Sequence, residues 1–182
     1  MTLTFGSAPF RFALMGKSGS GKSSAGRLLA ERFEVPHIRT GKICREIALL
    51  LFGNEDKSST HRLDDALTQI DPSIFLRAAL REAGAENAEL SESRQGFIID
   101  ALRFESDLTL AKSHGCRIIR ISAPDDIRVS RLAERNQVFD LMTDGRHRSE
   151  YELDAAAVDY EIVNDNDLDS LRAALRAIEA PN

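Results

Sequence analysis

The stretch Gly16-Lys17-Ser18-Gly19-Ser20-Gly21-Lys22-Ser23 decides the fold of this chain. It fits the pattern G-x-x-x-x-G-K-S/T of a phosphate-binding loop, and the apolar run 10–15 directly precedes it. The glycines let backbone N–H groups turn toward phosphate oxygens, and the helix that follows presents its positive N-terminal end to the same anion. The order strand, loop, helix therefore predicts a nucleoside triphosphate site from Gly16 to Ser24.

Two residues of this phosphate loop (P-loop) are expected to contact the nucleotide and its metal directly. Lys22 is expected to reach the β- and γ-phosphates, and Ser23 to offer its hydroxyl to Mg²⁺, which takes few protein ligands. The alternative is a flexible Gly/Ser-rich turn. The apolar helical face that begins immediately afterwards, at Ala25, Leu28 and Leu29, favours the nucleotide site. We therefore expect ATP and Mg²⁺ as donor and cofactor.

Length and charge narrow the class of protein. The 182 residues suit a single domain, and 24 basic against 29 acidic residues give a net charge of -5, which argues against a general nucleic-acid or membrane binder. Cys44 and Cys116 lack metal-ligand spacing and are expected to be buried packing residues. No N-terminal leader or membrane-spanning stretch is visible, so we predict a cytoplasmic protein.

Apolar periodicity predicts alternating strands and helices. Strands are expected at 10–15, 96–100, 116–122 and 160–163, and helices at 22–33, 42–52, 61–69, 72–84, 104–114, 124–135, 149–157 and 167–179. The polar stretch 53–60 is predicted to be a loop. This alternation predicts an α/β protein with the three-layer P-loop NTPase fold: a mostly parallel five-stranded sheet with helices on both faces and a small lid. We expect one domain over 1–182, with an acceptor-binding helical region at about 39–90 and the lid at about 136–148.

A second anchor is the strand Phe97-Ile98-Ile99-Asp100, which ends in a carboxylate. Beside a P-loop, Asp100 is expected to hold a magnesium-bound water or to orient an acceptor, although such an Asp alone is often only part of a turn. Arg103 follows three residues later and is expected to hold an acceptor phosphate.

The segment Arg39-Thr40-Gly41-Lys42-Ile43-Cys44-Arg45 resembles the T-G-x-x-x-R segment of nucleoside monophosphate kinases of the adenylate kinase type. The resemblance implies an acceptor site at Arg39, Thr40, Gly41 and Arg45. From the residues alone, Thr40 caps a helix and Arg45 emerges one turn later, which also describes a capped helix with an exposed arginine. Lys42 stands where adenylate kinases usually carry Asp, so the acceptor base stays open.

Three arginines, Arg128, Arg131 and Arg135, lie along one predicted helix, and Arg146 and Arg148 follow. Such a stripe is often a solvated helix face. By its order and position the segment 128–148 resembles the lid of P-loop kinases, whose arginines neutralise charge on the transferred phosphoryl group. The resemblance implies this role for Arg131 and Arg135 above the others.

The second half of the chain is also similar to phage-type deoxynucleoside monophosphate kinases and to the related animal-type phosphomevalonate kinases. The matching stretches are 99–105, 117–122, 149–150 and 159–165.

Together these features predict an enzyme that transfers a phosphoryl group from ATP to a nucleoside monophosphate, a deoxynucleotide or modified nucleotide. Its expected catalytic residues are Lys22, Asp100, Arg131 and Arg135. Kinases of phosphomevalonate or dephospho-coenzyme A are the enzymatic alternatives. A nucleotide-dependent switch is the alternative of another class, although no N/T-K-x-D guanine-reading segment is present. We expect a nucleotide as partner, no nucleic acid or membrane, and a monomer or homodimer.

Overall fold

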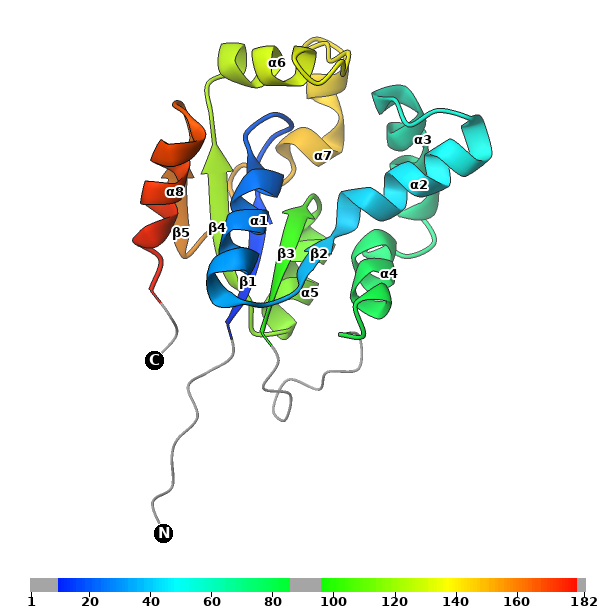
Figure 1. Ribbon diagram of the computed structural model, residues 1–182. Coiled ribbons are helices and arrows are strands. Elements are labelled where there is room, and N and C mark those ends of the chain that lie inside the picture. Colours follow the sequence, from blue (N-terminus) through cyan, green and yellow to red (C-terminus); the bar gives the residue numbers. More distant parts are fainter. Residues whose placement is uncertain (1–9, 86–95, 180–182) are drawn as a thin grey trace.

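The structure, a computed structural model, describes residues 10–85 and 96–179 (Figure 1). Residues 1–9, 86–95 and 180–182 lie outside this description, and with them the end of the expected acceptor-binding region and both ends of the expected domain. The elements follow the chain in this order: β1 (Arg11–Met15), α1 (Lys22–Phe33), β2 (His37–Arg39), α2 (Thr40–Phe52), α3 (Lys57–Leu67), α4 (Ile74–Glu82), β3 (Phe97–Leu102), α5 (Glu105–Ser113), β4 (Arg117–Ser122), α6 (Asp125–Ala133), the 3-10 turn η1 (Asp144–Arg146), α7 (Arg148–Tyr151), β5 (Tyr160–Val163) and α8 (Leu168–Arg176).

The strands form one five-stranded sheet in the order β2-β3-β1-β4-β5. Every neighbouring pair is parallel, and the central strand β1 pairs Phe12 with both Ile98 of β3 and Arg117 of β4. Parallel neighbours cannot be joined by a tight hairpin and need crossover connections, which the helices supply here. The parallel sheet confirms the expected α/β fold and brings the carboxyl ends of all strands to one edge, where the loop after β1 lies.

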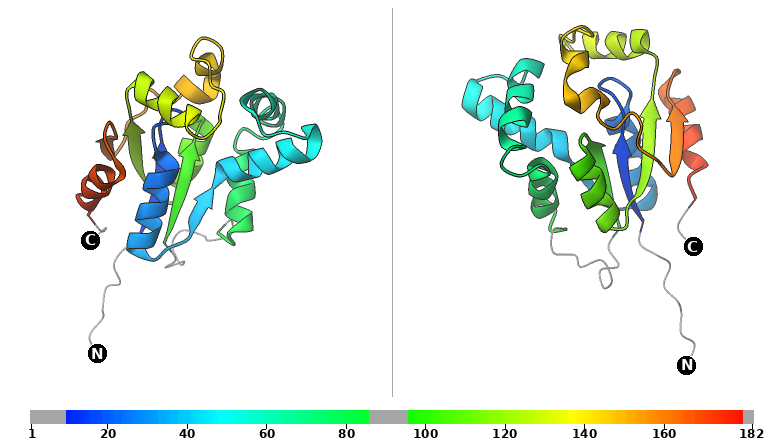
Figure 2. Two further views of the ribbon diagram at one scale, coloured as in Figure 1. Left: turned by 45° about the horizontal axis from the view of Figure 1, so that its top comes forward. Right: turned by 180° about the vertical axis from the view of Figure 1, so that it is seen from behind.

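Two apolar cores cover the two faces of this sheet. From β1, Phe12 and Leu14 pack with α1 and α8, whereas Ala13 and Met15 pack with α4 and α5. A strand buried on both faces has no polar side to show, which explains why the sequence runs apolar without alternation from residue 12 to 15. Figure 2 shows the sheet between these helical layers.

Three segments differ from what the sequence predicts. The apolar pattern does not reveal β2, because three residues are too few to show a period. Helix α3 begins at Lys57, inside the predicted loop, because Asp56 caps it and accepts a hydrogen bond from a backbone N–H three residues on, over 2.8 Å. The helix predicted at 149–157 ends at Tyr151 and continues as turns.

Two groups of helices stand at the carboxyl end of the sheet. In Figures 1 and 2, α2 and α3 lie beyond the β2 edge, and α6 and α7 lie over the ends of β1 and β4. The loop after β1 faces the space between them. Within the described ranges, no helix is long and apolar enough to cross a bilayer.

Candidate functional site

The P-loop is held between β1 and α1 by close backbone contacts. Gly16 has φ 140°, and a Cβ there would lie 2.1 Å from the carbonyl oxygen of Ile121 in β4. Gly21 has φ 98°, and a Cβ there would lie 2.2 Å from Nδ2 of Asn164, which donates a hydrogen bond to the carbonyl of Ser20 over 2.8 Å. Only glycine fits these positions, so β4 and the turn after β5 fix the shape of the loop.

Lys22 begins α1 and folds back over the loop. Its Nζ donates a hydrogen bond to the carbonyl of Lys17 over 2.7 Å. Burial lowers its pKa to about 8, although the carboxylates of Glu150 and Asp100 act in the opposite direction. Lys22 is therefore a cation at neutral pH, held at the mouth of the loop where nucleotide phosphates would sit.

Asp100 lies in β3 opposite the end of β2, and only 3% of it is exposed. Burial acts to raise its pKa, but nearby His37, whose Nε2 lies 3.5 Å from Oδ2, together with Ser23 and the charge of Lys22, outweighs this and holds the pKa below its usual range. Its Oδ1 atom is buried without a hydrogen-bond partner. An ionised carboxylate with a spare oxygen beside the Ser23 hydroxyl fits Mg²⁺, which keeps several waters and needs few protein ligands.

A bulge in β3 directs Asp100 into the site. The pairing of β1 with β3 runs from Ala13↔Ile99 to Met15↔Leu102, so β3 has one extra residue there. The hydroxyl of Thr40 donates hydrogen bonds to the carbonyls of Asp100 and Ala101, over 2.7 and 2.9 Å. Thr40 therefore ties α2 to the bulge and does not cap α2, for which Arg39 is the capping position.

The two expected acceptor arginines converge over Gly41. A Cβ on this buried glycine would lie 3.2 Å from Nη1 of Arg45 and 3.5 Å from Nη2 of Arg103. Burial and the charges of Arg39 and Arg103 lower the pKa of Arg45, while Glu55 acts against this from 3.8 Å. Guanidinium groups packed together in this way attract an anion with several oxygens. Arg39, Gly41, Arg45 and Arg103 therefore share one basic corner.

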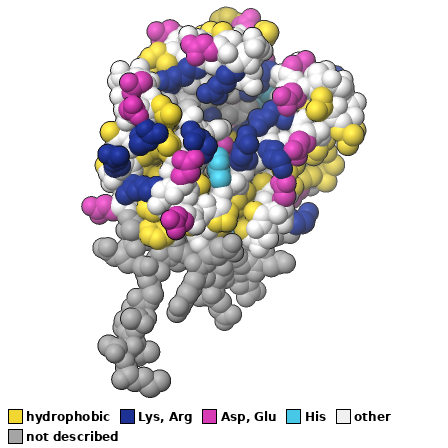
Figure 3. Space-filling model, in the orientation of Figure 1, with side chains coloured by type: hydrophobic (Ala, Val, Ile, Leu, Met, Phe, Trp, Pro, Cys, Tyr) yellow, Lys and Arg dark blue, Asp and Glu magenta, His cyan; other side chains and the backbone are white. Residues whose placement is uncertain are grey.

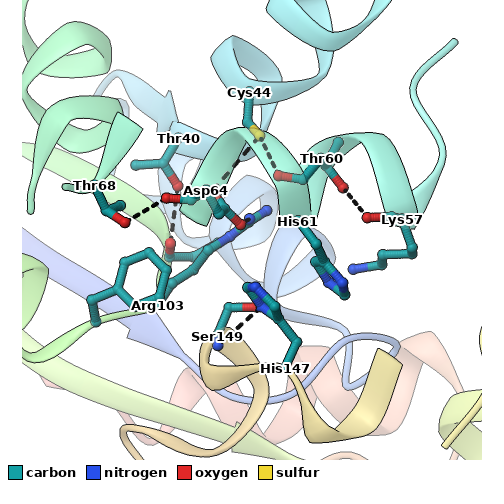
Figure 4. A network of polar contacts seen from close by, with 12 residues as sticks. Thr40, Cys44, Lys57, Thr60, His61, Asp64, Thr68, Arg103, His147 and Ser149 are labelled. Carbon is teal, nitrogen blue, oxygen red and sulfur yellow. Dashed lines mark hydrogen bonds and ion pairs between the residues drawn. The ribbon is translucent and has the colours of Figure 1, made fainter. Parts of the chain in front are cut away.

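Asp64 of α3 holds one of these arginines. Its Oδ2 accepts a hydrogen bond from Nη1 of Arg103 over 2.6 Å, and Cys44 Sγ lies 3.8 Å from its Oδ1 (Figure 4). Lys42, in contrast, turns away from the corner and donates to Glu82 of α4 over 2.6 Å. The residue that departs from the adenylate kinase pattern thus does not line the acceptor corner.

The arginines of α6 take different directions. Arg128, whose side chain is 3% exposed, donates from Nε to the carbonyl of Ser18 over 2.7 Å and so contacts the P-loop. Arg131 donates to the carbonyls of Asn164 and Asn166 in the turn after β5, over 2.8 and 2.6 Å, and Arg135 is exposed. In this structure Arg128 is the α6 arginine at the loop, and the roles expected of Arg131 and Arg135 stay predictions.

A carboxylate and a lysine from distant segments meet at Ser18. Glu150 of α7 accepts hydrogen bonds from the Ser18 backbone N–H, over 2.9 Å, and from its hydroxyl. Lys57 of α3 donates from Nζ to the same hydroxyl over 2.8 Å. Burial acts to raise the pKa of Glu150, but the charges of Lys22 and Lys57 outweigh it and keep the carboxylate ionised.

Basic side chains surround the mouth of the loop. Figure 3 shows Lys and Arg side chains gathered around a hollow between the α6 and α2 sides of the molecule. A cavity of about 210 Å³ lies beside the loop, toward the end of β4, α6 and α7, and its lining includes Gly16, Lys17, Arg103, Arg128 and Glu150. P-loop residues and an acceptor-corner arginine therefore line one cavity.

Residues 13–152 match the sequence profile of a family described as AAA domain. The chain belongs to this AAA domain family. The matched region contains the P-loop, Asp100, the arginine corner and Glu150.

Curated relatives of this chain include two nucleotide kinases. It is 29% identical over 161 residues to adenylate kinase 1 of Nostoc sp., covering 82% of this chain and 83% of that protein. It is 26% identical over 182 residues to cytidylate kinase of Rhodopseudomonas palustris, covering 93% and 84%.

Solved structures resemble this chain in fold. Shikimate kinase from Acinetobacter baumannii, solved with shikimate, has a TM-score of 0.55 at 13% identity and covers 92% of this chain and 89% of that chain. A sugar kinase from Janibacter sp. has a TM-score of 0.53 at 20% identity, covering 91% of both chains. The fold of this AAA domain is that of the P-loop kinases.

Several site residues of this AAA domain carry no sequence signal. Lys57 and Asp64 belong to no recognisable motif, and His37 begins a strand that the pattern does not reveal. Glu150 falls in the matching stretch 149–150, but that resemblance gave it no role. Asp56 before Lys57 is the one usable sign, because an N-cap predicts that the lysine begins a helix.

Proposed function

We propose that this protein transfers the γ-phosphoryl group of ATP to the phosphate of a nucleoside monophosphate. The products are ADP and the nucleoside diphosphate. Family, P-loop and fold make it a phosphotransferase, and the acceptor is the proposed part. The observation that carries the proposal is the convergence of Arg45 and Arg103 over Gly41, because Arg103 also lines the cavity beside the P-loop. A paired guanidinium corner suits an acceptor that already carries a phosphate.

This chemistry asks for positioning and charge neutralisation. An acceptor phosphate is itself a competent nucleophile, so no general base is required. Lys22 would hold the β- and γ-phosphates, Arg45 and Arg103 would hold the acceptor phosphate, and Arg128 would brace the loop through Ser18. Mg²⁺, when bound by Ser23 and Asp100, would neutralise charge on the donor phosphates.

The relatives support a nucleotide as acceptor. Two of them are named adenylate kinase and cytidylate kinase, and they match over most of this chain. We propose a deoxynucleotide or modified nucleotide within this class. We further propose that α2, α3 and α4 form the acceptor-binding helical region, and that the segment 136–148 acts as the lid of the same domain.

One observation favours a second candidate, a kinase with a hydroxyl acceptor such as dephospho-coenzyme A. The carboxylate of Asp100 is ionised, and its Oδ1, which has no hydrogen-bond partner, would accept a hydroxyl proton. A buried oxygen with no partner also suits a magnesium-bound water, so the basic corner decides in favour of the phosphate acceptor.

A panel of acceptors tests the proposal. ATP consumption with Mg²⁺ is measured with each ribo- and deoxynucleoside monophosphate, with phosphomevalonate and with dephospho-coenzyme A, and Lys22→Ala serves as control. We expect one or a few nucleoside monophosphates to stimulate turnover at least about 100-fold over water. Stimulation by dephospho-coenzyme A alone would favour the hydroxyl acceptor, and tight ATP binding without any stimulation would favour a switch.

A further inference from the structure

Lys57 is a basic residue from the acceptor-side helices that reaches the P-loop. Its Nζ donates a hydrogen bond to Oγ of Ser18 over 2.8 Å and lies 4.0 Å from Oε1 of Glu150. Its side chain is 24% exposed. The contact spans 39 positions in sequence and joins the start of α3 to the donor side of the site.

Contacts from two segments hold this lysine in place. Asp56 caps α3 and so fixes where its first residue lies, and the Thr60 hydroxyl donates to the Lys57 carbonyl over 3.1 Å (Figure 4). From the other side, the ring of Phe139 faces the ammonium, with Nζ 5.8 Å from the ring centre. The cap and the Thr60 bond fix the backbone of Lys57, and Phe139 is the contact from a distant segment that faces its ammonium.

The charges that act on Lys57 come from both the donor and the acceptor sides. Burial and the positive charge of Arg103 lower its pKa, and Glu150 acts against this. Lys22 interacts with the same ammonium from the P-loop side. Lys57 therefore lies within electrostatic range of both the donor lysine and the acceptor arginine.

The negative group that balances these cations is Glu150. Its carboxylate accepts the Ser18 backbone N–H over 2.9 Å and lies 3.4 Å from Nη2 of Arg128. Backbone N–H, hydroxyl, ammonium and guanidinium groups together form the kind of donor set that binds a phosphoryl group. A carboxylate occupies it in this structure.

We propose that Lys57 is a further catalytic residue, whose ammonium contacts the phosphoryl group while it passes between Lys22 and Arg103. An acceptor oxygen forms a bond to the γ-phosphorus, and the bond from that phosphorus to the β,γ-bridging oxygen breaks, with its electron pair leaving on ADP. Lys57 stays protonated throughout and stabilises the negative charge on the oxygens of the phosphoryl group during its transfer. The proposal rests on the phosphoryl-transfer part of the proposed function and not on the identity of the acceptor.

The test compares Lys57→Met and Lys57→Arg with Lys42→Met, a lysine of α2 that binds Glu82 away from the site. We expect Lys57→Met to lower kcat by about 100-fold or more, while KM for ATP, affinity for ADP and the melting temperature change little. Lys57→Arg should recover at least about tenfold of the loss, because it restores the charge. Lys42→Met should match the wild type.

Two results would overturn the proposal. One is a kcat of Lys57→Met within about threefold of the wild type. The other is a loss of kcat accompanied by equal losses of ADP affinity and thermal stability, which would make Lys57 a structural residue. If no nucleoside monophosphate stimulates turnover, the proposed acceptor is wrong, and the same variants are then compared in slow ATP hydrolysis by water, where the same loss is expected.

Discussion

Asp64 and Arg103 form a partly buried ion pair that joins α3 to the end of β3. Nη1 of Arg103 donates to Oδ2 of Asp64 over 2.6 Å, and the aspartate side chain is 1% exposed. The pair uses one side of the guanidinium, and Nη2 faces Gly41 and Arg45 on the other. Asp64 thereby sets the direction in which Arg103 meets an acceptor.

Asp64→Asn should weaken acceptor binding without affecting the donor. We expect KM for the acceptor to rise about 10- to 100-fold and KM for ATP to change little, because Arg103 loses its fixed direction. The unfolding free energy should fall by about 1–3 kcal/mol, because a buried charge loses its ionic partner. Asp65→Asn is the matched control at an exposed neighbour. An unchanged acceptor KM in Asp64→Asn would show that Arg103 needs no such support.

Gly16→Ala should distort the P-loop. The new methyl group would lie 2.1 Å from the Ile121 carbonyl, at a φ of 140° that alanine rarely adopts. We expect ADP affinity to fall about 100-fold or more, as measured by calorimetry. Gly53→Ala is the control, because Gly53 also has a positive φ, of 71°, but no atom lies within 4 Å of the added group. Equal ADP affinity in both variants would contradict this account of the loop.

Nucleotide affinity should depend on the charge of Lys22. Burial lowers the pKa of this lysine to about 8, so the free protein loses the positive charge as pH rises through that value. Phosphates bind the charged form, and we expect ADP affinity to decline above pH ~8, approaching tenfold per pH unit. Lys22→Arg should remove this decline, because a guanidinium stays charged. Wild-type affinity that stays constant to pH ~10 would contradict the role of Lys22.

The rings of His61 and His147 stack with centroids 3.8 Å apart and connect α3 to the start of α7 (Figure 4). Burial, His147 and Lys57 lower the pKa of His61 to about 4, although Asp144 and Asp64 act in the opposite direction. The native state thus resists protonation, and the unfolded chain binds the proton at pH ~6.5. The unfolding free energy therefore has its full value above pH ~6.5, and it decreases as pH falls toward 4 because only the unfolded chain takes up the proton.

His61→Phe keeps a stacking ring that cannot titrate. We expect the variant to lose less unfolding free energy than the wild type between pH ~7 and ~4.5, by about 1–2 kcal/mol, in urea melts. His114→Phe, at the end of α5 and outside this stack, is the control for exchanging a histidine for a phenylalanine. Identical slopes for the wild type and His61→Phe would show that His61 does not titrate in this way.

The sequence predicted the α/β fold and several of the segments that gather at the site, because these sit in local patterns. The P-loop and the Thr40-Gly41 segment each follow a strand and Asp100 lies near the end of one, and strand ends meet at one edge of a parallel sheet. Contacts between distant segments could not be read in the same way. Glu150 meets Ser18 across 132 positions, and no motif links them.

The α6 arginines show a second limit. Arg128 and Arg131 are three positions apart and lie on neighbouring parts of one helix face, yet the first contacts Ser18 and the second contacts Asn164. Which arginine meets the P-loop depends on how α6 is rotated over the sheet. That rotation is set by tertiary packing and has no local sequence signal.

Transfer of a radiolabelled γ-phosphoryl group from ATP to a nucleoside monophosphate tests the central claim most directly. Products are separated after incubation with the wild type and with Lys22→Ala. We predict label in the nucleoside diphosphate made from the acceptor, little label in inorganic phosphate, and no labelled diphosphate with Lys22→Ala. ATP bound by the wild type, with label released only as inorganic phosphate for every ribo- and deoxynucleotide tried, would contradict the account.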